Sequence, residues 1–403
     1  MKYLLSILIA LWIPSAALSN HYPDRKKTDT PAGLLTVFHF KQLTGGIIVI
    51  NAEVGDSSDT LHFIFDTGCS SLALDSTTCA RYKLETYLSD KYILGLGSRQ
   101  RAVFTKGLAL RLPHLTIDSV QFHVSDYELL SETYGLHIDG IIGYDIIRNY
   151  VVQINFDSLT MAFYKPGVFN YGRKGVLLFT PLDLRIPLVN AELKNGIKVN
   201  HDFYFDMGAG LNTLFAAQFV KDSSLMVHQQ KKRKRFVSEL QGNAGKLRMA
   251  ITTFPELKID GYTFRKVPLY IFEDSTQVMK YPKTGGLIGN DLFRRFNITL
   301  NYPQQEIYLQ PNSHFRDAFD YSYTGLCYYF IDGRIEVTDV IAHSPAEKAG
   351  FEPGDIIVAV DKNFSNDIQA YQELLKQTKT KIPVIISRNG RLIAKKLYVA
   401  SIL

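Results

Sequence analysis

The chain has 403 residues, more than one ordinary hydrophobic core accommodates, so two or three domains are expected. Hydrophobic residues make up 46% and charged residues 21%, which excludes an intrinsically disordered chain and favours a globular one. Much of the net charge of +6 comes from one basic run, KKRKR at 231–235. We interpret this run as a solvated loop, with a polyanion contact or a processing site as alternatives. No nucleic-acid partner is expected.

The first residues have the layout of a secretory signal peptide. Lys2 precedes an apolar run from Tyr3 to Ile13, and small residues follow up to Ser19. The run is too short to span a bilayer, and it holds no cysteine for a lipid anchor. We therefore predict a signal peptide over 1–19, a short segment over 20–33, no membrane span in the mature chain, and export.

The three cysteines, Cys69, Cys79 and Cys327, do not have the spacing of a zinc site. Because an exported protein permits disulfides, Cys69 could pair with Cys79 or remain a buried free thiol. Cys327 is expected to be free. No metal or cofactor is predicted.

Two segments of the chain are each repeated later in the same order. NAEV…HFIFDTG at 51–68 is echoed by NAEL…DFYFDMG at 190–208. DGIIGYDIIRNYVVQINFDSLTMAFY at 139–164 is echoed without a gap by GGLIGNDLFRRFNITLNYPQQEIYLQ at 285–310. The chain therefore holds two related lobes, over about 34–167 and 175–311.

Short apolar or alternating runs bounded by Gly, Pro, Asp and Asn predict a mainly β structure in both lobes. Helices are expected to be brief, over 143–150, 289–296 and 212–220. Asp66 and Asp206 occupy equivalent places in the two lobes. If the lobes pack about a pseudo-twofold axis, these carboxyl groups meet and share one proton. One of them can then act as a base on water while the other polarises a carbonyl group.

The motifs FDTGCSS and DGIIG resemble the active-site loop and the hydrophobic-hydrophobic-Gly segment of pepsin-like and retropepsin-like aspartic proteases. The resemblance implies a two-lobed acid-protease fold in which Asp66 and Asp206 are the catalytic acids. It also implies that Thr67 braces the active-site loop, that Gly68 and Gly208 allow close backbone approach, and that the GIIG segment passes beneath the loop.

The resemblance further implies a hairpin flap over the substrate. Candidate tips contain Gly95 and Gly97 in the first lobe and Gly242 and Gly245 in the second, although plain surface hairpins would look the same. The second lobe departs from the family pattern because Met207 stands where Thr or Ser is usual. Methionine cannot donate the bracing hydrogen bond.

After residue 311 the repeat ends, and a different domain is predicted over 320–403. Ser344, Pro345 and Glu347 form a helix start, Gly350 suits a left-handed helix end, and 366–377 reads as an amphipathic helix with Asn366 and Gln369 as a cap pair. This region resembles a PDZ domain. By that resemblance the carboxylate-binding loop comprises Gly325, Leu326, Cys327 and Tyr328.

Together these features predict an exported aspartic endopeptidase that hydrolyses a polypeptide substrate, while its PDZ domain binds peptide C-termini by strand addition or holds a partner protein. Alternatively, the PDZ domain only packs on the protease or mediates assembly. The order of segments resembles bacterial aspartyl-protease–PDZ proteins, which implies the periplasm. One alternative is a catalytically impaired scaffold in which Met207 has cost the activity. Another is a dimer that pairs two first lobes, each contributing an Asp66.

Overall fold

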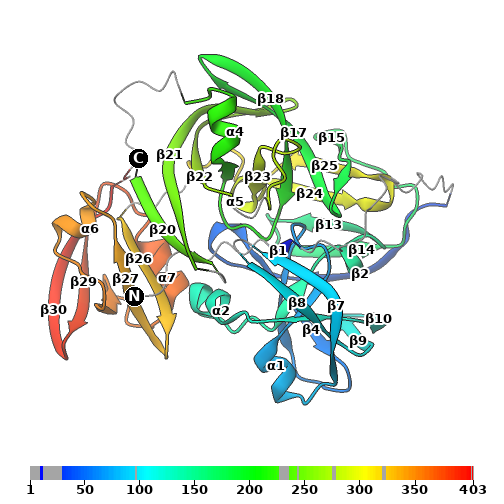
Figure 1. Ribbon diagram of the computed structural model, residues 1–403, viewed down its shortest axis with the longest axis horizontal. Coiled ribbons are helices and arrows are strands. Elements are labelled where there is room, and N and C mark those ends of the chain that lie inside the picture. The colour runs from blue at the N-terminus through cyan, green and yellow to red at the C-terminus, as the bar shows by residue number, and fades with distance from the viewer. Residues whose placement is uncertain are drawn as a thin grey trace.

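The computed structural model describes residues 10–11, 30–95, 98–226, 236–242, 245–274, 278–319, 324–400 and 402. The predicted signal peptide, apart from Ala10–Leu11, and the basic run 231–235 lie outside these ranges. Four β-sheets dominate the fold, so the prediction of a mainly β protein is confirmed. Two lobes lie one above the other in Figure 1, and the C-terminal domain lies beside them, in orange and red.

The first lobe is built on an eleven-stranded sheet. In spatial order its strands are β1 (Ala10–Leu11), β7 (Thr86–Gly95), β8 (Ser98–Thr105), β11 (His123–Ser125), β6 (Leu72–Asp75), β12 (Gly140–Ile142), β5 (Leu61–Phe65), β4 (Ile48–Val54), β9 (Leu108–Leu112) and β10 (Leu115–Val120), with β3 (Lys41–Gln42) beside β4. Its helices are η1 (Thr44–Gly46), α1 (Ser76–Arg81), α2 (Glu128–Tyr134) and α3 (Tyr144–Ile147).

The second lobe is built on an eight-stranded sheet. Its order is β16 (Leu182–Asp183), β17 (Ile186–Asn195), β18 (Ile197–Asp206), β23 (Gly286–Gly289), β19 (Thr213–Ala216), β22 (Tyr262–Phe272), β21 (Gly245–Ile259) and β20 (Phe236–Gly242). Its helices are α4 (Ala217–Asp222), α5 (Asn290–Phe293) and η2 (Tyr302–Gln304).

A six-stranded sheet joins the lobes, and its two middle strands come one from each lobe. The order is β15 (Val176–Phe179), β25 (Glu306–Pro311), β24 (Phe296–Asn301), β13 (Val151–Asn155), β14 (Thr160–Tyr164) and β2 (Leu34–His39). The pairing of β13 with β24 is antiparallel, with Val151 opposite Asn301. The chain segments that repeat each other in sequence therefore lie side by side at the centre of the molecule.

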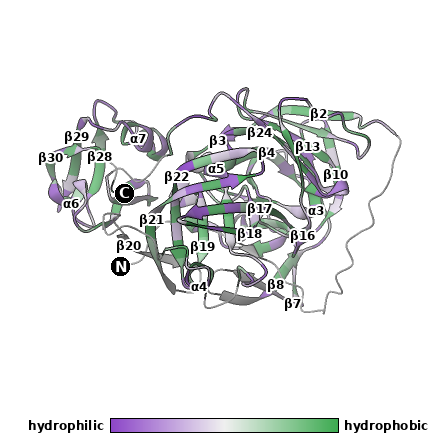
Figure 2. Cartoon of the chain, turned by 90° about the horizontal axis from the view of Figure 1, so that it is seen from above, coloured by the Kyte–Doolittle hydropathy of each residue, from purple (hydrophilic) through white to green (hydrophobic). Residues whose placement is uncertain are grey.

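The C-terminal domain contains a five-stranded sheet in simple order: β26 (Leu326–Ile331), β27 (Arg334–Val340), β28 (Ile356–Val360), β29 (Lys381–Arg388) and β30 (Arg391–Tyr398). Its helices are α6 (Pro345–Lys348) and α7 (Ile368–Leu374). The domain has a core of its own, separate from the core shared by the two lobes. Figure 2 shows apolar residues concentrated along the strands of both regions.

The structure confirms some local predictions and corrects two. Ser344 caps α6 by accepting a hydrogen bond from the Glu347 N–H, and Gly350 has φ of +76°, as expected. The segment predicted as a helix over 212–220 begins instead as strand β19, because its apolar residues extend the buried sheet. Likewise the side chain that caps α7 belongs to Asp367, and the side chains of Asn366 and Gln369 bond elsewhere.

Candidate active site

Each lobe presents an aspartate at the end of a buried strand, by the same local topology. In the first lobe β5 runs parallel to β12, and Asp66, the next residue after β5, donates its backbone N–H to the carbonyl of Ile142. In the second lobe β18 runs parallel to β23, with Asp206 opposite Gly289. The apolar runs before both acids are buried between neighbouring strands, which explains why they are near-continuous rather than alternating.

The GIIG segment and its repeat pass beneath the two aspartate loops. A Cβ atom on Gly143 would lie 2.3 Å from the carbonyl oxygen of Cys69, and one on Gly289 would lie 2.3 Å from that of Leu211. The residue after each glycine bonds back to the loop, Tyr144 to Cys69 and Asn290 to Ala209. Only glycine permits this approach, so the loop and the segment below it hold each other in place.

The two aspartate side chains meet at the junction of the lobes. Their carboxyl groups hydrogen-bond to each other, and both are almost completely buried. A Cβ on Gly68 would lie 2.5 Å from Cγ of Asp206, and a Cβ on Gly208 would lie 2.1 Å from Cγ of Asp66. Each glycine therefore makes room for the carboxyl group of the opposite lobe.

Backbone amides hold each carboxyl group in place. Asp66 accepts from the N–H of Gly68 at 2.7 Å, and Asp206 accepts from the N–H groups of Gly208 and Ala209 at 2.9 and 3.0 Å. Burial raises the pKa of Asp66 to about 6, and burial together with the neighbouring Asp66 charge raises the pKa of Asp206 well above its usual value. The pair therefore keeps one proton well above the pH at which an exposed aspartate loses it.

Thr67 braces the two loops with a single hydroxyl group. Its Oγ1 donates to the carbonyl of Phe205 at 2.8 Å and accepts from the N–H of Met207 at 2.9 Å. The Met207 side chain is fully buried and supplies no such group in return. A symmetric arrangement would have a hydroxyl group from each lobe bonding to the loop of the other. Here only the hydroxyl group of the first lobe is present.

A buried polar cluster lies behind the first loop. Ser71 Oγ lies 2.9 Å from Nδ1 of His123, and the backbone N–H of Tyr127 donates to Asp75. Burial lowers the pKa of His123 to about 4, so its ring is neutral at physiological pH. Asp139, just before GIIG, accepts from the hydroxyl of Thr78 and from Arg81. The polar groups of this cluster thus have hydrogen-bond partners, and they support the loop that carries Asp66.

All three cysteines lie in the described part of the chain, and each is a free thiol. Burial raises the pKa of each, so none is a reactive thiolate. The possible pairing of Cys69 with Cys79 is not formed.

Three of the four candidate flap glycines lie at the ends of paired strands. Gly95 ends β7 and pairs with Ser98 of β8, and Gly242 at the end of β20 pairs with Gly245 at the start of β21. Gly97 lies outside the described residues. The pairing partner of Gly95 on its other side is Ala10 in β1.

The predicted carboxylate-binding loop is short. Gly325 has φ of +74° and accepts from the N–H of Ile341, whereas Leu326, Cys327 and Tyr328 already belong to the edge strand β26. Cys327 packs against the core of the protease lobes, and Tyr328 packs against the core of the C-terminal domain. Neighbouring side chains of β26 thus pack on two different cores, that of the protease lobes and that of the C-terminal domain.

Sequence reasoning missed three residues at this junction. The guanidinium of Arg185 donates to the carbonyl of Ser70, at 3.3 Å, and pairs with Asp145. Tyr134 lies close to the second aspartate loop, and so does the η1 turn that begins at Thr44, through its next residue Gly45. The Thr-Gly-Gly turn at 44–46 was a usable signal for close approach, but neither Tyr134 nor Arg185 stands in a pattern that sequence alone could interpret.

Comparison with protein families agrees with this arrangement. Residues 50–146 match the aspartyl protease family, and residues 336–388 match the PDZ domain. The chain therefore joins an aspartyl protease domain to a C-terminal PDZ domain. The protease match lies within the first lobe, so the relationship of the second lobe rests on the repeated sequence and the matching sheet topology. A search of curated proteins found no match.

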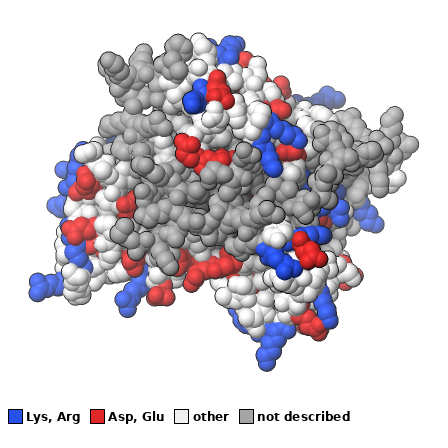
Figure 3. Space-filling view, in the orientation of Figure 1, with Lys and Arg blue, Asp and Glu red and all other residues white. Residues whose placement is uncertain are grey.

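Among the residues that the structure describes, no helix is long and apolar enough to cross a membrane. On the face shown in Figure 3, basic and acidic side chains of the described residues are interspersed.

Proposed function

We propose that the chain is an aspartic endopeptidase in which Asp66 and Asp206 activate a water molecule. The unprotonated carboxylate takes a proton from the water molecule as the water oxygen attacks the peptide carbonyl carbon. The protonated carboxyl group donates to the carbonyl oxygen, which gives a tetrahedral intermediate. One carboxyl group then donates its proton to the amide nitrogen while the other carboxylate takes a proton from a hydroxyl group of the intermediate, so the C–N bond breaks, the carbonyl group re-forms and the singly protonated pair is restored.

The observation that carries this proposal is the buried pair itself. Two aspartates from equivalent loops share a hydrogen bond, and each is flanked by a glycine that admits the other. Both carboxyl groups have raised pKa values because of burial, which suits a pair that must hold one proton. An extended polypeptide between the lobes, with its scissile carbonyl above the pair, is the substrate that this geometry fits.

Hydrolysis of a quenched peptide library by the parent, Asp66→Asn and Asp206→Asn tests the proposal. Both variants are expected to lose at least about 10³-fold in kcat/KM, because each removes one member of the acid–base pair. Asp118→Asn, on exposed strand β10, is the matched control and should retain parental activity. Activity of the parent should rise with pH through an apparent pKa of about 6, as the pair loses its first proton.

Met207 favours a second candidate, a peptide-binding scaffold with impaired catalysis. If the parent hydrolyses no peptide while its PDZ domain still binds peptide C-termini, the scaffold replaces the enzyme. Full activity in Asp206→Asn would instead indicate that two first lobes pair in a dimer.

We further propose that the chain is exported to the periplasm or secreted and that the PDZ domain binds peptide C-termini or a partner protein. The supporting features are the signal-like first 19 residues and the edge position of β26. Cell fractionation with N-terminal sequencing of the mature protein tests export. An uncleaved cytoplasmic product would contradict it.

A further inference from the structure

A glutamine side chain at the start of α7 hydrogen-bonds the PDZ domain to the first protease lobe. Oε1 of Gln369 accepts two hydrogen bonds from Thr44, from its backbone N–H at 2.8 Å and from its hydroxyl at 2.9 Å. Nε2 of Gln369 donates to the backbone carbonyl of Tyr134 at 3.2 Å. The amide therefore uses both its acceptor and a donor to join two segments of the first lobe, η1 and the end of α2.

The surrounding contacts show a close-packed junction. A Cβ on Gly135 would lie 2.6 Å from Ile368 in α7 and 3.7 Å from Cβ of Phe330 in β26. Strand β26 packs along α2, which lies between the PDZ domain and the rest of the first lobe in Figure 1. Tyr329 of this strand is buried. The hydrogen bonds of Gln369 thus lie beside a close-packed contact between the two domains.

Both segments that Gln369 joins pack on the same residue of the second lobe, Gly210. A Cβ on Gly45, next to Thr44, would lie 2.3 Å from the carbonyl oxygen of Gly210. The hydroxyl oxygen of Tyr134 lies 3.1 Å from the place that a Cβ on Gly210 would occupy. Gly210 therefore lies between the two segments, in tight backbone contact with Gly45 on one side and facing the hydroxyl group of Tyr134 on the other.

Gly210 ends the loop that carries Asp206. The N–H groups of Gly208 and Ala209, the two preceding residues, hold the Asp206 carboxylate. From the first lobe, the other end of the loop is braced by the Thr67 hydroxyl, which has no counterpart at Met207. The contact at Gly210 is thus a second support that the first lobe gives to a loop lacking half of its usual brace.

We propose that Gln369 is a positioning residue for the dyad, through which the PDZ domain holds the Thr44 and Tyr134 segments against Gly210 and so fixes the loop of Asp206. This inference rests on the proposed function for its catalytic consequence. It assigns to the PDZ domain a role in the protease site that is separate from peptide binding.

The test compares Gln369→Leu with Gln377→Leu in the full chain. Gln377 lies just beyond the same helix with an exposed side chain, so its variant is the matched control. Gln369→Leu should lower kcat about tenfold and leave KM within about twofold, because misplacement of a catalytic group by 1 Å can cost up to about 10²-fold. Gln377→Leu should match the parent, and thermal unfolding should show both variants folded.

Thr44→Val removes a hydrogen bond of the same contact from the protease side and should also lower kcat. Thr44→Ser is its conservative control. If the residues act through one contact, Gln369→Leu and Thr44→Val combined should lower kcat by less than the product of their separate effects. Thr44→Ser should restore most of the activity, since it keeps the hydroxyl donor.

A readout independent of turnover separates this inference from the proposed function. In protein labelled with ¹³C at aspartate Cγ, assigned by the Asp→Asn variants, the titration of Asp206 should shift in Gln369→Leu and Thr44→Val but not in the controls. Parental kcat and parental titration in both variants would overturn the positioning role, even in an active enzyme. An inactive parent would refute the protease proposal, and the titration would still decide the role of Gln369.

Discussion

At the scale of single residues, Thr67 connects the two aspartate loops through its side chain. Its hydroxyl makes two hydrogen bonds to the backbone of the second aspartate loop, and it is almost fully buried. The equivalent residue of the second lobe, Met207, fills space but makes no polar contact through its side chain. The geometry of Asp206 therefore depends on a hydroxyl that belongs to the other lobe.

Thr67→Val should consequently damage the protein on two measures. Loss of both bonds, with the Met207 N–H left unsatisfied, should lower the free energy of unfolding by about 1–3 kcal/mol and kcat by about 10²-fold. Chemical denaturation and peptide hydrolysis measure these effects. Thr67→Ser keeps the hydroxyl and is the control. Equal activity of the Val and Ser variants would show that the brace has no catalytic importance.

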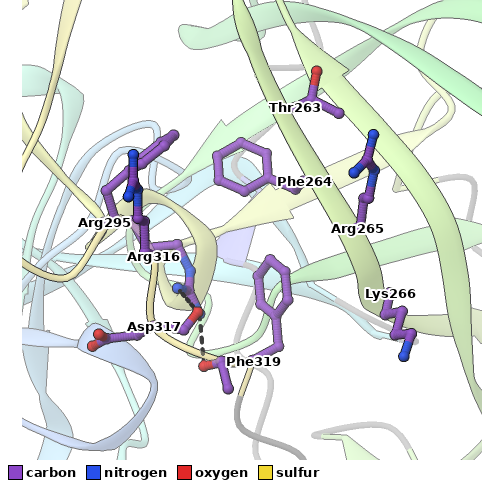
Figure 4. Close-up of a pocket in the computed structure, with 10 residues that line it drawn as sticks. Thr263, Phe264, Arg265, Lys266, Arg295, Arg316, Asp317 and Phe319 are labelled. Atoms are coloured by element: carbon purple, nitrogen blue, oxygen red, sulfur yellow. Dashed lines mark hydrogen bonds between the residues drawn. The ribbon is translucent and has the colours of Figure 1, made fainter.

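At the scale of elements, a buried arginine contacts the segment that leads from the second lobe toward the PDZ domain. Arg295, which follows α5, donates to the backbone carbonyls of Asp317 and Ala318 at 2.5 and 3.1 Å, and its guanidinium lies over the ring of Phe319. Figure 4 shows this arrangement around a pocket. The pocket is lined by Thr263, Phe264, Arg265, Lys266, Arg295, Phe315, Arg316, Asp317, Ala318 and Phe319. The arginine thus supplies hydrogen bonds to carbonyl groups of a connection that lies outside the described strands and helices, beside the ring contacts of Phe315 and Phe319.

Arg295→Leu should release the connecting segment, because two or more carbonyl groups lose their donor at about 1–3 kcal/mol each. Limited digestion with chymotrypsin should then cut near Phe315 and Phe319 faster than in the parent. Arg316→Leu is the control, since Arg316 has the same side chain but is exposed. Equal cutting rates in the two variants would contradict the supporting role of Arg295.

At the scale of the whole molecule, the buried pair makes stability depend on pH. The pKa of Asp66 is about 6 in the folded protein and about 4 in the unfolded chain, so the folded state holds its proton more strongly. The resulting stabilisation is complete below pH 4 and is lost as the pH rises through 6. Asp206, whose pKa is also raised, acts in the same direction.

The free energy of unfolding should therefore fall by about 3 kcal/mol or more between pH 4 and 7.5 on account of this pair. Denaturant titrations at several pH values measure it. The double variant Asp66→Asn with Asp206→Asn should lose most of that fall, whereas Asp118→Asn should keep it. A parental pH dependence in the double variant would show that the pair does not hold a proton in the folded state.

Much of this protein could be predicted from its sequence. The repeat around Asp66 and Asp206 indicated two related lobes and a pair of acids, because a duplicated chain that folds twice places equivalent residues near one axis. Helix caps such as Ser344 were also predictable, since they depend on residues within one turn. These features are local or repeated, and the sequence carries them directly.

Only the tertiary structure decided how the parts brace each other. That Thr67 serves both loops, that Arg295 holds the connection, and that Gln369 reaches Thr44 and Tyr134 instead of capping its own helix all depend on contacts between residues far apart in the chain. A side-chain amide reads as a helix cap when only its neighbours in sequence are known. Close packing of domains sets its real partners, because buried polar groups must find hydrogen bonds wherever the fold supplies them.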